Sequence, residues 1–249
     1  MSLMSDSRQA LPVGESALAW HIVKRAPRIA HPCLQAALWQ QVQRGALDFV
    51  GLIAVIGSLA GFLTIATVEL RFGLGIVLGV RVLVALILGP LASFVSALLL
   101  VTGPGAATTF ELGLMRYHGE LRTLRLIGID PRDFLVLPRV VGFSLSLFVL
   151  TFTFQSAAVL GGFALAAAFT QISFAQHFDA LVTLLQPSRV IASVLTTLFL
   201  GAVLGVLVCH QGLAAPFSPT EMPRIARELL SRSLVVVVIV LGAANLLLS

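Results

Sequence analysis

The sequence predicts an all-α polytopic membrane protein, with an amphipathic helix at the membrane interface, five transmembrane helices and a charged cytoplasmic helical insert between the second and third. Three observations support this prediction. First, 58% of the 249 residues are hydrophobic and only 11% are charged, with a mean hydropathy of +1.01, well outside the balance of a water-soluble domain. Second, uncharged runs long enough to cross a hydrocarbon core of ~30 Å recur along the chain. Third, the charged residues gather in the short segments between those runs.

The N-terminal segment is polar and basic, and its two parts are expected to differ. Residues 1–16 are expected to be flexible. Residues 17–44 alternate apolar and basic groups and carry Trp20 and Trp39. Arginines pair with anionic headgroups and indole rings favour the membrane boundary, so one or two amphipathic helices are expected in the inner-leaflet interface. The first sustained apolar run begins only near Ala46, so no cleavable signal peptide is predicted.

Residues 45–249 are expected to form one transmembrane domain, because five uncharged regions have the length of a span. The third region is ambiguous, since residues 140–178 carry no charge and are almost long enough for a two-helix hairpin around Gly161 and Gly162. The segments GSLAG and GAVLG place glycines one turn apart, which permits close helix packing within the chain or between subunits. The predicted spans are Phe49–Val68, Val82–Thr108, Val140–Ala168, Val190–Cys209 and Leu234–Leu248.

The distribution of positive charge favours five spans over six, because short cytoplasmic loops are enriched in Lys and Arg. Of the 16 such residues, five spans with an inside N-terminus place 13 inside and three outside, whereas a sixth span would leave ten against six. Five spans predict a cytoplasmic N-terminus and a periplasmic C-terminus. The surplus apolar length then fits a tilted third span followed by an outer-face loop or short helix through Phe174–Leu185.

Composition and motifs weigh against several classes of function. The basic residues are scattered among short segments, a pattern that does not favour nucleic acid binding. Cys33 and Cys209 are isolated, as are the five histidines, so neither a disulfide nor a metal site is predicted. A secondary transporter or channel is an alternative, but it would place ionisable residues deep in the spans. An intramembrane enzyme would need a base beside a serine, and a non-transport scaffold is a further alternative.

The segment from Glu111 to Phe134 holds four arginines and four acids between two apolar runs. We expect a helix from about Glu111 to Ile127, followed by Gly128, because leucine and tyrosine side chains recur at 3,4,3 spacing and form an apolar stripe. A second short helix is expected to begin at Asp130, which can cap it. The alternative is a helical loop whose arginines only orient the protein. The predicted stripe consists of Leu114, Tyr117, Leu121 and Leu124.

This segment resembles the signature of the MlaE family, also called YrbE, the permease subunits of MCE-associated lipid ABC transporters. Members typically read A-E-[IL]-G-x-M-[KR], then E-Q-[IL]-x-x-[LM]-x-x-M-[GA]-V-D-P, then L-V-x-P-R. With Gln40 and Gly45 before the first span, the likeness covers roughly residues 35–249. The residues that match the signature are Glu111, Leu112, Gly113, Met115, Arg116, Glu120, Leu121, Leu124, Gly128, Asp130, Pro131, Leu135, Val136, Pro138 and Arg139.

The resemblance implies a permease subunit of the bacterial inner membrane that moves lipid, a phospholipid or another hydrophobic lipid, between that membrane and an MCE-domain protein. The insert, residues 111–133, is then similar to a coupling helix that docks on a separate ABC ATPase, and that partner binds ATP and Mg²⁺. The chain itself lacks a GxxxxGK[ST] phosphate cradle, and its only lysine is Lys24. Further implied partners are an MCE-domain protein, a second permease protomer and the lipid. The implied coupling residues are Glu111, Met115, Arg116, Glu120, Leu121, Leu124, Arg125, Asp130 and Pro131.

The chain departs from the family pattern in its second span. Where members have R-E-L-G-P, this chain has L-I-L-G-P, and the A-G-R-x-G-S-A element before Glu111 lacks its arginine. Intramembrane charges are costly and usually functional, so their loss alters the expected lipid path or dimer seam. The chain could be a permease for a different or less polar lipid, or one half of a heterodimer. The positions that the resemblance assigns to the lipid pathway are Leu86, Ile87, Gly89 and Pro90.

Overall fold

The computed structural model describes residues 43–68, 76–126, 135–169, 174–184, 186–214 and 222–248. Every regular element within these ranges is helical. The flexible segment and nearly all of the interfacial region predicted for residues 1–44 lie outside them. The prediction of five spans is confirmed, because five helices of the described ranges are long and apolar enough to cross a membrane. They are Asp48–Ala66, Gly89–Tyr117, Leu137–Phe169, Pro187–Ala214 and Arg224–Leu246.

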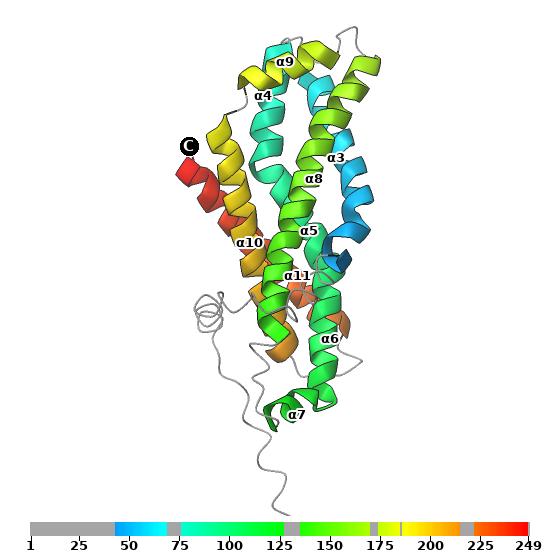
Figure 1. Cartoon of the computed structure of the whole chain (residues 1–249), viewed down its shortest axis with the longest axis vertical. Helices are drawn as coiled ribbons and strands as arrows, with labels where there is room; N and C mark the ends of the chain where they lie inside the picture. The colour runs from blue at the N-terminus through cyan, green and yellow to red at the C-terminus, as the bar shows by residue number, and fades with distance from the viewer. Residues whose placement is uncertain are drawn as a thin grey trace, which may run out of the picture.

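The bundle is organised around α8 (Leu137–Phe169), which lies between α3 (Asp48–Ala66) and α10 (Pro187–Ala214), as Figure 1 shows. A short π-helical turn, η2 (Gln43–Leu47), precedes α3. The last helix, α11 (Met222–Leu248), packs against α10 and against the second span. The bulkiest buried side chains of α8 are phenylalanines, so this helix contributes much of the core: Phe143, Phe154 and Phe163 are at most 1% exposed.

The second span is segmented, and its predicted bounds, Val82–Thr108, are wrong at both ends. Gly89 has φ −86° and ψ −135°, which is not helical, and Pro90 follows it. Proline has no N–H to donate and disfavours a helical conformation in the residue before it, so the chain kinks here. The continuous span therefore begins at the kink, with Gly89, and runs past Thr108 to Tyr117, while α4 before the kink is a separate, shorter apolar helix. The segments in order are α4 (Ile76–Leu86), η4 (Ile87–Leu91), α5 (Ala92–Leu100), η5 (Val101–Gly105) and α6 (Ala106–Tyr117).

The third region is one long helix and not a hairpin. Residues 161 and 162 lie inside α8, where they contact α3: a Cβ added to Gly162 would lie 2.9 Å from the carbonyl carbon of Gly61. The predicted short helix after this span is present as α9 (Phe174–Leu184). Figure 1 shows α9 lying across the end of the bundle opposite to α7 (Glu120–Leu126).

The glycine pairs serve packing within the chain. A Cβ on Gly57 would lie 2.7 Å from the carbonyl oxygen of Phe154, and a Cβ on Gly205 would lie 2.9 Å from the Cα of Val140. The backbones of α3 and α10 thus both pack against the backbone of α8 at positions with no room for a side chain, which favours dispersion contacts in a membrane. A hydrogen bond of 2.9 Å from Gln155 Nε2 to Ser193 Oγ also joins α8 to α10.

Candidate functional site

The charged insert begins as a continuation of the second span and then turns sharply. α6 ends at Tyr117, and α7 starts at Glu120. Between them, Gly119 has φ +77° and its N–H bonds to the carbonyl of Arg116 at 3.1 Å. Only glycine adopts this left-handed conformation without steric cost, and it commonly terminates helices. The prediction of one helix from Glu111 to Ile127 is therefore wrong.

The helix break also divides the predicted apolar stripe. On α6, Leu114 and Tyr117 are exposed, the tyrosine to 67%. On α7, Leu121 is buried and Leu124 is half-buried. The 3,4,3 spacing runs through Gly119, where the chain leaves the helical conformation, so the four side chains do not lie on one helix face. α7 instead presents its own exposed leucine, Leu126, which is 79% exposed at the end of the helix.

Two polar contacts hold the base of the insert to the bundle. Arg139 Nη2, at the start of α8, donates to Glu111 Oε2 at 3.2 Å. The Arg116 guanidinium donates to the backbone carbonyl of Leu213, in the last turn of α10. Carbonyls in the last turn of a helix lack partners within that helix, so a cation beside them is stabilising. α6 is thus joined to both α8 and α10 where the span becomes the insert.

The structure places the predicted coupling residues on two helices. Glu111, Met115 and Arg116 lie on α6, and Glu120, Leu121, Leu124 and Arg125 lie on α7. Asp130 and Pro131, with the helix predicted to begin there, lie outside the described residues. Sequence reasoning did not find the pairing of Glu111 with Arg139. The only sign of this pairing in the sequence was that both residues belong to the matched signature.

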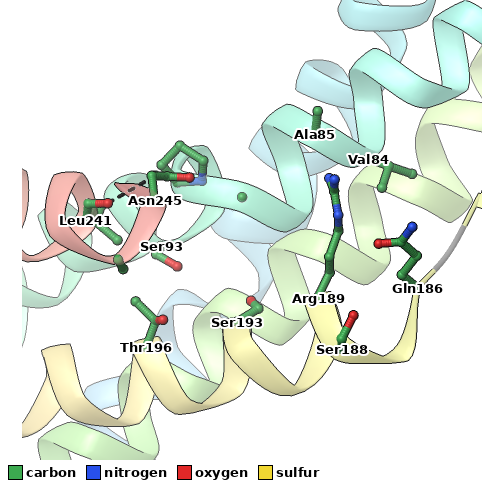
Figure 2. Close-up of a pocket in the computed structure, with 13 residues that line it drawn as sticks. Val84, Ala85, Ser93, Gln186, Ser188, Arg189, Ser193, Thr196, Leu241 and Asn245 are labelled. Atoms are coloured by element: carbon green, nitrogen blue, oxygen red, sulfur yellow. Dashed lines mark hydrogen bonds between the residues drawn. The ribbon is translucent and has the colours of Figure 1, made fainter. Parts of the chain in front are cut away.

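A cavity of about 400 Å³ lies at the helix break of the second span (Figure 2). Gly89 and Pro90, two of the positions predicted for the lipid pathway, line it together with residues of α10 and α11. Leu86 and Ile87 do not line it: the first is 45% exposed elsewhere on the surface and the second is fully buried in the core. Irregular backbone within a membrane is tolerated where it borders a cavity, and broken helices commonly form transporter binding sites.

The wall of this cavity is more polar than the spans around it. Among the described lining residues, Arg189 alone has a charged side chain. Neither Arg189 nor Asn245 was predicted as a site residue, because only the fold brings the ends of α10 and α11 to the break in the second span. The polar lining residues are Ser93, Gln186, Ser188, Arg189, Ser193, Thr196 and Asn245.

A second cavity, also about 400 Å³, lies between α8 and α10. Its lining is mostly aliphatic and aromatic, including Phe148, Phe152 and Leu160. Ser193 borders this cavity as well as the polar one, so the two share a wall of α10. In the part of the chain that the structure describes, no group of three or more His, Cys, Asp or Glu side chains is arranged to hold a metal ion.

Comparison with known proteins gives one family and two relatives of note. The family model described as Permease MlaE matches residues 38–247. The chain is 28% identical over 122 residues to the chloroplast protein trigalactosyldiacylglycerol 1 of Arabidopsis thaliana, a match to 49% of this chain and 35% of that protein. It is also 28% identical over 123 residues to a probable ABC transporter permease protein of Synechocystis sp., covering 49% and 47% of the two chains. The match spans less than half the length of each of these relatives.

Proposed function

The chain belongs to the MlaE permease family, and from this premise we propose that it is the membrane-spanning permease subunit of a lipid ABC transporter. It moves lipid between the bacterial inner membrane and an MCE-domain protein, and a separate ATPase subunit drives the movement. The N-terminus is then cytoplasmic and the C-terminus periplasmic. The name of the Synechocystis relative supports the ABC assignment.

The observation that carries this proposal is the continuity of the second span with the insert. α6 continues the second span out of the bundle, so a force on α7 reaches a transmembrane helix through the short turn at Gly119. The same helix is joined to α8 by Glu111 and to α10 by Arg116. α6 and α10 also touch closely, since a Cβ on Gly212 would lie 2.9 Å from that of Leu112. A rigid, well-anchored element transmits displacement, as interdomain switching requires.

The energy source and the full lipid path both require other chains. This chain has no phosphate cradle, so ATP and Mg²⁺ are bound by the ATPase. A five-span subunit encloses little space by itself, and a dimer of permeases can surround an acyl chain. The uncharged Leu86 and Ile87 fit either a permease for a less polar lipid or a heterodimer whose other half carries the charges.

Co-purification tests the proposal. The tagged chain, expressed with the ATPase and MCE-domain protein of its operon, should isolate both. Glu120→Lys reverses an exposed charge of α7 and should reduce ATPase recovery. The control, Asp179→Lys, reverses an exposed charge of α9 at the opposite end of the bundle and should leave ATPase recovery unchanged. Recovery of the ATPase at the wild-type level with Glu120→Lys would contradict the coupling role. Purification of the chain alone as an active transporter would contradict the ABC assignment.

A further inference from the structure

We propose that Arg189 binds the anionic headgroup of a lipid in the polar cavity, and that this makes the permease selective for anionic over zwitterionic lipids. This inference rests on the proposed function and names the substrate class of its pathway. It concerns the cavity bordered by Gly89 and Pro90, into which Arg189 extends from α10 toward α4 (Figure 2).

The first step concerns charge: the described lining of the cavity includes the cationic side chain of Arg189 but no acidic side chain. Leu86 and Ile87, just before the break, contribute no charge, and none of the described lining residues is Asp or Glu. Within the described ranges, the ion pairs involve other arginines, and none joins a carboxylate to Arg189. Arg189 is exposed in the first turn of α10, so its guanidinium is open to an anion that enters the cavity. The cavity itself offers that guanidinium no carboxylate among its described lining residues, and an anionic ligand would supply the missing negative charge.

The second step is the geometry of the donors. A guanidinium is a planar fork that binds phosphate oxygens with two parallel hydrogen bonds. Figure 2 shows Gln186 and Ser188 beside Arg189. Asn245 faces the same cavity from α11. The Asn245 amide already donates to the carbonyl of Leu241 at 3.0 Å, which fixes its orientation and leaves its second N–H for a ligand. Hydroxyl and amide donors thus line the same cavity as one cation, which suits an oxyanion.

The third step favours a lipid over a free oxyanion as the source of this group. The apolar cavity between α8 and α10 adjoins the polar one at Ser193. Its described lining contains no charged side chain and is mostly aromatic and aliphatic, which suits an acyl chain better than an inorganic ion. A polar and an apolar cavity side by side match the two ends of a lipid. The absence of a lining carboxylate also leaves the ammonium of a zwitterionic headgroup without a partner.

Native mass spectrometry of the purified full chain tests this inference, with palmitoyl-oleoyl phosphatidylglycerol, the matching phosphatidylcholine and inorganic phosphate as probes. Wild type should bind phosphatidylglycerol more tightly by about tenfold, because both lipids offer phosphate oxygens to Arg189 but only phosphatidylglycerol brings a net negative charge to it. Arg189→Gln should remove this preference, and Arg189→Lys should keep part of it. The matched control is Arg81→Gln, which removes an exposed arginine of α4 outside the cavity and should keep the preference.

Each outcome is decisive. An unchanged preference in folded Arg189→Gln protein overturns the role of Arg189 and leaves the permease assignment intact. Displacement of phosphatidylglycerol by millimolar inorganic phosphate shows that the site takes the free ion and overturns the lipid selectivity. If wild type binds neither lipid while the ATPase also fails to co-purify, the proposed function itself fails.

Discussion

Glu111 and Arg139 are 28 residues apart in the sequence, yet Arg139 Nη2 lies 3.2 Å from Glu111 Oε2. The pair therefore joins the two ends of the charged insert, since Glu111 is its first residue, on α6, and Arg139 follows it on α8. The Arg139 side chain is only 12% exposed and the Glu111 side chain 48%. This ion pair therefore joins the second span to the start of the next one at the base of the insert.

Removal of Glu111 should destabilise the protein. The variant Glu111→Gln leaves a largely buried guanidinium without its counter-charge, which should cost about 1–3 kcal/mol, between the values for exposed and buried pairs. Thermal unfolding in detergent should show a lower Tm. The double variant with Glu111→Arg and Arg139→Glu should recover part of the loss, and the absence of any coupling between the two positions would show that the pair contributes nothing.

Substitution of Gly61 should disrupt the packing of α3 on α8. A Cβ there would overlap the backbone carbonyl of Ala158, which cannot move without displacing α8. Gly61→Ala should therefore lower stability by roughly 1–3 kcal/mol, as overpacked cores do. Gly51→Ala is the matched control. Gly51 is on the exposed side of α3, and no atom lies within 4 Å of an added Cβ. Because alanine has a higher helix propensity than glycine, this variant should be as stable as wild type or slightly more stable. Equal effects at both positions would contradict this account.

Gly119 should be required for the turn between α6 and α7. A residue with a side chain would be strained at the φ of +77° found here, although no atom lies within 4 Å of an added Cβ. Gly119→Ala should cost about 1–2 kcal/mol locally or straighten the insert, and so weaken ATPase stimulation by lipid in the assembled complex. Gly119→Asn should retain most of the stimulation, because asparagine tolerates the left-handed region. Full activity of Gly119→Ala would show that this turn does not transmit the ATPase stroke.

The number of spans could be predicted because apolar length and charge placement are local properties of the chain. The bounds of the second span could not, since the uncharged run continues across Gly89 and Pro90 while the helix does not. The same limit applies to the insert, where regular leucine spacing concealed the change of direction at Gly119. Arg189 could not be assigned to a cavity from sequence, because the cavity forms only when the distant helices α4, α10 and α11 meet.

The two ends of the bundle should be accessible from opposite sides of the membrane. Figure 1 places α7 and α9 at opposite ends, and Thr123 and Asp179 are exposed on them. In a background with both native cysteines replaced, Thr123→Cys should react with a membrane-impermeant maleimide only after cytoplasmic access is given, and Asp179→Cys should react in intact spheroplasts. The buried Cys209 should tolerate replacement by alanine, which is smaller and apolar. Labelling of Thr123→Cys from outside would separate α7 from any cytoplasmic ATPase, and α6 would then have no source of force.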